Sequence, residues 1–138
     1  MKTIHHVVEI AAPAPAVWAA LTTEDGLAGW WSTSVAVDGD RITFTFAGDF
    51  NPVMEITRRV EGRELEWRCT GGHAKWMDNT FPFELVVLDD GRTRLRFTQN
   101  YAVELSDDDY GTYNFNWGYY LESLRLLSTT GTGKPFRP

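Results

Sequence analysis

The sequence predicts an α+β fold in which a curved antiparallel sheet of about seven strands is covered by one long C-terminal helix. Residues 35–101 alternate between apolar and polar side chains, as strands with one buried face do. Residues 107–130 instead repeat their apolar side chains at helical spacing. Two short helical stretches separate a first strand, residues 3–11, from the others. A one-sided sheet and a one-sided helix are complementary, so we expect them to pack together.

Size and composition limit the classes of protein to consider. A chain of 138 residues without repeats or linker-like stretches predicts a single domain over residues 1–138. One cysteine excludes an intrachain disulfide, and neither a signal-peptide-like start nor a membrane-span window is seen, so we expect a cytoplasmic protein. The net charge of −6 disfavours nucleic acid as a partner, because phosphate binding depends on Lys and Arg.

The first strand leads into the two short helices. Pro13 suits the first turn of a helix, which we expect to run to Thr22. Thr22 and Asp25 have the spacing of a capping box, so the second short helix is expected to follow and to reach Trp30.

The alternating region predicts a meander of about six strands. Turn-forming residues separate the strands at 38–40, 48–52, 61–63, 70–72 and 89–91. The side chains predicted to face inward are Ile42, Phe44 and Phe46; Met54 and Ile56; Leu65, Trp67 and Cys69; Phe81, Phe83, Leu85 and Val87; and Leu95, Phe97, Gln99 and Tyr101.

The long helix has clear signals at both ends. Ser106 and Asp109 form a capping box, and Gly131 is suited to end the helix. Its inner arc is predicted to consist of Tyr110, Tyr113, Trp117, Tyr120, Leu121, Leu124 and Leu127.

This order of elements is the helix-grip arrangement, and several segments resemble one superfamily that has it. Residues 10–21, IAAPAPAVWAAL, resemble the I-x-A-P-x-x-x-V-W-x-A-L segment of START-like (SRPBCC, Bet v 1-like) proteins, and Gly29-Trp30-Trp31 resembles their aromatic pair. Residues 116–124 and 131–136 resemble the terminal helix and tail of the branch named after the activator of the Hsp90 ATPase. The resemblance implies a cavity between sheet and helix that takes lipids, sterols, polyketides, hormones or other hydrophobic molecules; only some members of the superfamily are enzymes.

Three polar residues interrupt the predicted inner surfaces: His6, Gln99 and Asn114. A buried amide or imidazole needs a partner, so they form a structural hydrogen-bond network or orient the polar end of a ligand. The apolar walls of the ligand site are predicted to be Trp30, Trp31, Phe44, Met54, Trp67, Trp76, Phe83, Tyr113, Trp117 and Leu121. For each aromatic side chain, plain core packing is the alternative.

Other chemistries have weak support. His5 and His6 are adjacent and point to opposite faces of a strand, and His73 lies in a Gly-rich turn, so no metal site is expected. Cys69 belongs to an inward apolar set, where a thiol is inert. No phosphate loop, serine elbow or dinucleotide motif occurs, so we assign no cofactor and no catalytic residue.

Three functions remain open. The first is binding of a small apolar or aromatic ligand in a cavity of roughly 300–1,000 Å³. The second is an enzyme of cyclase, aromatase or hydrolase type that uses the same cavity, with His6 or Gln99 as its polar participant. The third is a protein-interaction module, such as a chaperone-associated one.

The outer side of the long helix carries an apolar stripe formed by Phe115, Tyr119 and Leu126. Exposed apolar stripes mark contacts. The sequence leaves two explanations: a homodimer interface, or a C-terminal tail that folds back and places Phe136 over part of the stripe.

Overall fold

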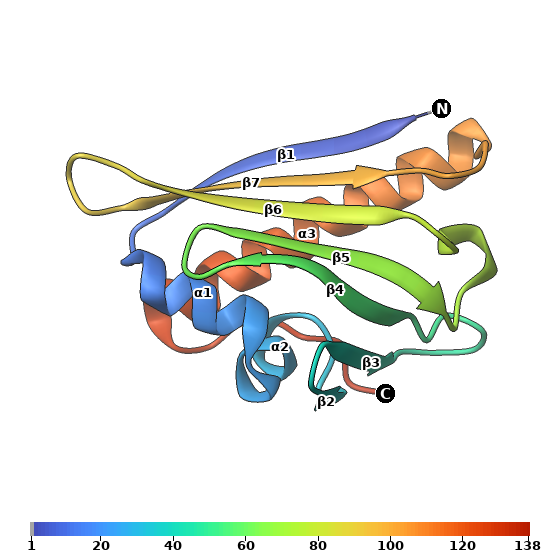
Figure 1. Cartoon of the computed structure of the whole chain (residues 1–138), viewed down its shortest axis with the longest axis horizontal. Coiled ribbons are helices and arrows are strands. Elements are labelled where there is room, and N and C mark those ends of the chain that lie inside the picture. Colours follow the sequence, from blue (N-terminus) through green and yellow to red (C-terminus); the bar gives the residue numbers. More distant parts are fainter. Residues whose placement is uncertain (1) are drawn as a thin grey trace.

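Seven strands form one antiparallel sheet in the computed structural model, which describes residues 2–138 (Figure 1). The order across the sheet is β1-β7-β6-β5-β4-β3-β2. The strands are β1 (Thr3–Ile10), β2 (Ser34–Asp38), β3 (Arg41–Thr45), β4 (Val53–Val60), β5 (Glu64–Gly71), β6 (Thr80–Val87) and β7 (Thr93–Asn100). The predicted meander is therefore confirmed, with the first strand joined to the last.

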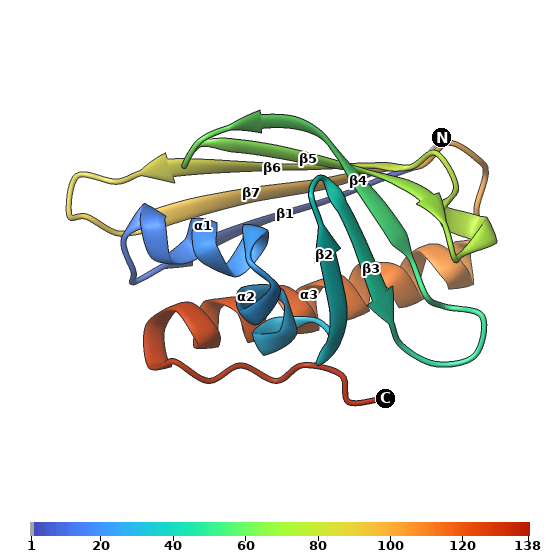
Figure 2. The ribbon, with the colours of Figure 1, turned by 60° about the horizontal axis from the view of Figure 1, so that its bottom comes forward.

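The sheet is strongly curved rather than flat. The β4–β5 pairing is interrupted between Val53 and Met54 and again between Ile56 and Arg58. Such irregularities bend a strand and increase its twist. Figure 2 shows the result: β2 and β3 turn away from the plane of the other strands and descend toward the helix α3 (Asp107–Thr130).

The two short helices are present, with one correction to their boundary. They are α1 (Ala14–Thr22) and α2 (Glu24–Trp30). The residue that caps α2 is Thr23, whose Oγ1 accepts a hydrogen bond from the Gly26 amide at 3.0 Å. The prediction that Thr22 caps this helix is wrong, because its hydroxyl donates to the Trp18 carbonyl inside α1 instead.

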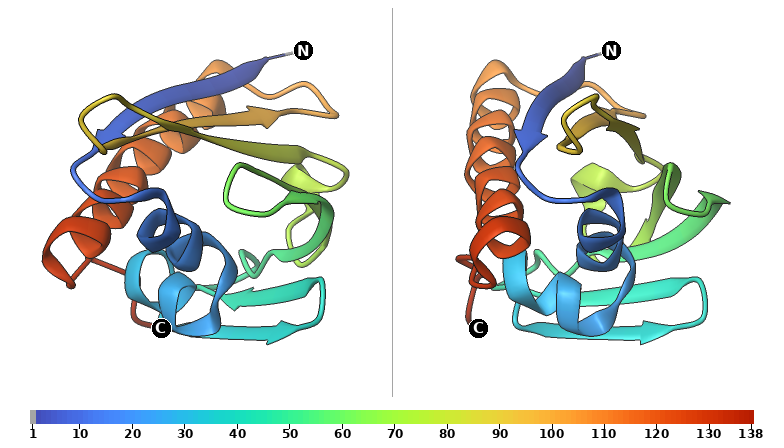
Figure 3. Two further views of the ribbon diagram at one scale, coloured as in Figure 1. Left: turned by 60° about the vertical axis from the view of Figure 1, so that its left-hand side comes forward. Right: turned by 90° about the vertical axis from the view of Figure 1, so that its left-hand side faces the viewer.

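The long helix begins and ends as predicted. Ser106 Oγ accepts from the Asp109 amide at 3.1 Å, and Gly131 ends α3 with a left-handed φ of 87°. Its buried side chains include Trp117, Leu121 and Leu124. Figure 3 shows α3 and the two short helices on the same concave side of the sheet, which confirms the helix-grip fold. None of the helices within residues 2–138 is long and apolar enough to cross a membrane.

The predicted inward side chains of the strands are buried with two exceptions. Val87 is 65% exposed, and Ile56 is only half-buried. Val87 lies at the end of β6, where the β6–β7 hairpin extends past α1 (Figure 1), so no helix covers it. The alternation rule gives the face of a residue, but not whether another element reaches that part of the sheet.

The C-terminal tail folds back along the molecule but does not cover the outer stripe of α3. The Phe136 amide donates to the Trp31 carbonyl at 2.8 Å, and the Phe136 carbonyl accepts from the Thr33 amide at 2.9 Å. The Phe136 ring lies 5.5 Å from that of Phe46. The proposed cover by Phe136 is therefore not observed, and Phe115 remains 74% exposed.

Candidate functional site

Trp31 occupies the centre of the space between sheet and helix. Its ring stacks against Trp67 at 6.0 Å, Trp76 at 6.2 Å and Trp117 at 5.1 Å, and meets Phe44 edge-on at 4.4 Å. Trp31 follows α2 directly, so the short helices carry it into the interior. The part of the interior in which a large cavity was expected is thus filled with aromatic rings.

The deeper layer is packed in the same way. Phe83 lies 4.7 Å from Trp67 and 5.1 Å from Phe97, and Phe97 lies 4.3 Å from Trp117. The Trp117 indole N–H donates to Gln99 Oε1 at 2.7 Å. This contact joins α3 to β7 through a buried polar pair.

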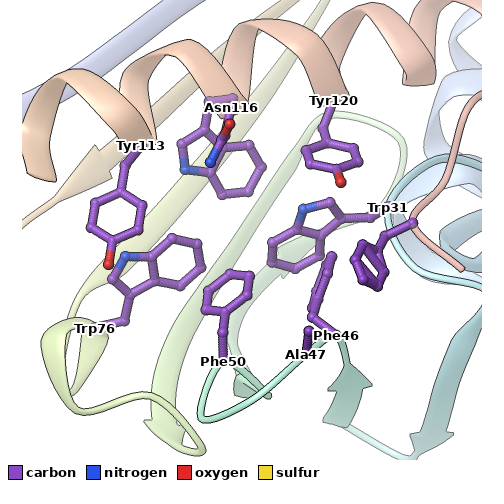
Figure 4. Close-up of a pocket in the computed structure, with 10 residues that line it drawn as sticks. Trp31, Phe46, Ala47, Phe50, Trp76, Tyr113, Asn116 and Tyr120 are labelled. Carbon is purple, nitrogen blue, oxygen red and sulfur yellow. The ribbon is translucent and has the colours of Figure 1, made fainter. Parts of the chain in front are cut away.

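An unfilled space remains between this packed layer and the surface. It has a volume of about 250 Å³, slightly below the range expected from the sequence (Figure 4). We call it the aromatic pocket, and its walls are Trp31, Phe46, Ala47, Phe50, Trp76, Tyr113, Asn116, Trp117, Tyr120 and Phe136. Eight of these ten side chains are aromatic. Ala47 and Asn116 are exposed, so the pocket reaches the protein surface.

Two loops and the tail form the outer wall of the pocket. The Phe50 amide donates to the Ala47 carbonyl at 3.1 Å, and the Phe46 amide donates to Asn51 Oδ1 at 3.0 Å, which holds the β3–β4 loop in a tight turn. The Asn51 amide in turn donates to the Gly72 carbonyl at 3.0 Å, which ties this loop to the one after β5. The second loop contains a single 3₁₀ turn, η1 (Ala74–Trp76), that presents Trp76.

The polar groups of the site lie at its edge. His73 Nε2 is 3.1 Å from the Tyr113 hydroxyl, and Lys75 pairs with Asp109 at 2.7 Å. Burial lowers the pKa of His73, which favours its neutral imidazole. Burial also raises the pKa of Tyr113, although Lys75 nearby opposes that shift.

A second polar pair lies behind Trp76. Burial raises the pKa of the Tyr101 hydroxyl strongly, and the Trp76 indole N–H opposes the shift. The two groups are neighbours, but their geometry falls short of a hydrogen bond. The Trp67 indole N–H is also buried without a partner among the described residues. Buried donors without a partner are uncommon, and the indole N–H groups of Trp67 and Trp76 are two such donors within the aromatic cluster.

The thirteen residues expected to form the ligand site separate into three groups. Four line the aromatic pocket: Trp31, Trp76, Tyr113 and Trp117. Six are packed into the core behind it: Trp30, Phe44, Met54, Trp67, Phe83 and Leu121. The remaining three are the polar residues His6, Gln99 and Asn114.

The polar residues do not meet in one place. His6 Nε2 lies 3.0 Å from Asn114 Oδ1 at the contact between β1 and α3, and Asn114 is exposed. Gln99 is fully buried against Trp117, and its Nε2 has no partner among the described residues. None of the three lines the aromatic pocket, so their hydrogen bonds fit the structural network that the sequence left open.

Six pocket residues were not among the candidates from the sequence: Phe46, Ala47, Phe50, Asn116, Tyr120 and Phe136. Phe46 and Tyr120 had been placed on the inner surfaces and could have been included. Phe50 and Phe136 lie in a turn and in the tail, where periodicity carries no information. An aromatic side chain inside a turn-forming segment was the available signal for Phe50.

Metal and thiol chemistry find little support in the geometry. Within residues 2–138, no group of three or more His, Cys, Asp or Glu side chains is placed to hold a metal ion. Cys69 is buried, its Sγ lies 3.4 Å from the Gly71 carbonyl oxygen, and burial raises its pKa. A thiol of that kind is a poor nucleophile.

Comparison with known proteins agrees with the fold. The chain is similar to the Aha1 dimer from Colwellia psychrerythraea, at 29% identity over 96% of this chain and 100% of that one, with a TM-score of 0.85. A Mesorhizobium loti protein superposes with a TM-score of 0.74 at 19% identity, over 91% of this chain and 96% of that one. DynU16, from the dynemicin biosynthetic locus, superposes with a TM-score of 0.76 at 17% identity, over 96% of this chain and 49% of that one.

No curated protein matches the chain at a significant level. The family model described as "Activator of Hsp90 ATPase homolog 1-like protein" matches residues 11–128, which is most of the chain. The chain therefore belongs to the Activator of Hsp90 ATPase homolog 1-like family.

Proposed function

We propose that the protein binds a small apolar or aromatic molecule in the aromatic pocket. The observation that carries this proposal is an unfilled space of about 250 Å³ walled by eight aromatic side chains and open to solvent. Because the pocket opens to solvent, its aromatic walls face water rather than other side chains. An apolar guest would pack against these rings and remove aromatic surface from water.

Binding is favoured over catalysis by the titratable groups of the pocket. Tyr113 and Tyr120 are the ionisable side chains among the lining residues, and burial raises the pKa of both. A general acid or base works best with a pKa near the working pH, and these tyrosines are shifted away from it. His73 does not line the pocket, and its Nε2 lies within hydrogen-bonding distance of the Tyr113 hydroxyl, at 3.1 Å.

Filling the pocket is expected to weaken binding strongly without unfolding the protein. Ala47 is an exposed lining residue, so Ala47→Phe places a ring in the pocket mouth while leaving the core intact. The probe is the neutral naphthalene dye prodan, whose fluorescence responds to an apolar environment. We expect prodan to bind the wild type one to one, to raise the melting temperature with its concentration, and to lose at least about tenfold in affinity for Ala47→Phe.

The matched control is Ala16→Phe, the same change at an exposed alanine of α1 that does not line the pocket. It should bind prodan like the wild type. Equal binding by both variants would place the dye elsewhere, and no binding by the wild type at any concentration would refute the proposal.

A second candidate function is self-association through the outer stripe of α3. Phe115 is 74% exposed and Tyr119 is 49% exposed, whereas large apolar side chains are normally covered. Leu126 continues the stripe and is half-buried. The similar protein from Colwellia psychrerythraea is described as a dimer, which supports a homodimer of this chain.

Tyr119→Glu is expected to convert such a dimer into a monomer, because it places a charge in an apolar contact. Light scattering at several protein concentrations measures the mass directly. Thr43→Glu adds the same charge at an exposed position of β3 whose side chain points away from α3, and it should leave the mass unchanged. A wild type that is monomeric throughout would exclude the dimer and leave the stripe for a different protein partner.

A further inference from the structure

We infer that the aromatic pocket selects small organic cations, specifically amines that carry methyl groups on a quaternary nitrogen. The inference rests on the proposed ligand-binding function and specifies the chemistry of the ligand. Three features of the site support it: the composition of its walls, the arrangement of its rings and the charges at its mouth.

The walls contain aromatic rings almost to the exclusion of other apolar groups. Apart from the eight aromatic residues, the lining set consists of Ala47 and Asn116; it includes no Leu, Ile, Val, Met, Lys or Arg. The core of the same protein uses aliphatic side chains freely, for example Ile42 and Leu65. A neutral hydrophobic guest would be held equally well by aliphatic walls, whereas a cation gains specifically from the negative face of an aromatic ring.

The rings surround the space from different directions. Trp76 lies nearly parallel to Trp31 and Trp117, at 15° and 13°, and these indoles form one side. The Phe50 ring stands at 88° to that of Trp76, and Phe46 lies at 67° to Trp31. Figure 4 shows Tyr113 and Tyr120 descending from α3 toward these rings. Rings at steep angles around one space form the cage that binds quaternary ammonium groups.

An unpaired carboxylate lies beside the mouth of the pocket. Asp49 lies in the β3–β4 loop between two lining residues, is exposed, and acts electrostatically on His73, Lys75 and Tyr113. None of the ion pairs among residues 2–138 involves Asp49. The nearby cation, Lys75, is paired with Asp109, and burial lowers the pKa of His73, which disfavours its charged form. An incoming cation therefore meets an uncompensated carboxylate.

A pair of ligands with the same shape tests the inference. Choline carries a trimethylammonium group, and neohexyl alcohol carries an uncharged tert-butyl group in its place. Titration followed by tryptophan fluorescence or by NMR should show choline binding about tenfold more tightly, or better, than the alcohol. Phe50→Leu should reduce choline binding at least severalfold and leave that of the alcohol nearly unchanged, because an aliphatic wall keeps the apolar contact and loses the ring face.

The charge contribution has its own variant and control. Asp49→Asn should weaken choline binding severalfold, and added salt should weaken it in the wild type but not in the variant. Asp89→Asn makes the same change at an exposed position in the β6–β7 turn, at the other end of the sheet, and should have no effect.

The possible failures are distinguishable. Equal or tighter binding of the uncharged alcohol, together with prodan binding that Ala47→Phe weakens at least about tenfold, would overturn the cation preference and leave the proposed function standing. Failure of choline, the alcohol and prodan alike would overturn both.

Discussion

Trp117→Ala is expected to lower the free energy of unfolding by about 3–5 kcal/mol, the range found when a large buried aromatic side chain is truncated. Trp117 is 2% exposed and packs against both Trp31 and Phe97. Its indole N–H also joins α3 to β7 through the hydrogen bond to Gln99. The truncation therefore leaves a cavity and a fully buried amide without any partner.

Denaturant titration measures this loss, and the variant Trp117→Phe separates its two components. Phenylalanine retains most of the packing but has no N–H, so Gln99 Oε1 loses its donor at a cost of about 1–3 kcal/mol. Adding Gln99→Leu to Trp117→Phe should recover part of that loss, since both polar partners are then gone. A loss below about 1 kcal/mol for Trp117→Ala would mean that the indole faces the aromatic pocket rather than the core.

The fold could be predicted because the signals for it are local. Period-two alternation fixed which residues of the sheet face the core, and the residues Ser106 and Gly131 fixed the ends of α3. The errors in the fold prediction are also local in origin. Thr22 and Thr23 are adjacent and equally suited to cap a helix, so spacing alone could not choose between them. Val87 has the right face but lies beyond the reach of the helices.

The pocket could not be located from the same pattern. Periodicity predicts which way a side chain points, but not whether it ends in the packed core or at a pocket. Trp67 and Trp117 both point inward, yet only Trp117 reaches the pocket, while Trp67 is enclosed by Trp31 and Phe83. The composition indicated more aromatic rings than a core of this size needs, but many of these rings pack against one another in the core. The outer wall of the pocket comes from irregular segments, where residues such as Phe50 are positioned by hydrogen bonds between distant loops.

The position of the C-terminal tail could not be predicted from periodicity either. Its path along the molecule depends on Gly133. A Cβ on Gly133 would lie 2.4 Å from the Gly29 carbonyl oxygen and 2.8 Å from that of Ser123. Both oxygens belong to helix backbone, Gly29 in α2 and Ser123 in α3, so neither moves easily. The close approach lets the Lys134 amide donate to Ser123 Oγ at 2.6 Å and carries the chain on to Phe136.

Gly133→Ala is therefore expected to destabilise the protein by about 1–3 kcal/mol, as overpacking does, and to displace Phe136 from the aromatic pocket. Prodan affinity should fall together with stability, because one wall of its site is lost. Gly111→Ala is the matched control: a Cβ there meets nothing within 4 Å, and alanine inside α3 should raise stability by about 0.5–1 kcal/mol without changing dye binding. If Gly133→Ala keeps both the wild-type unfolding free energy and the wild-type affinity, the tail contributes neither to the fold nor to the pocket.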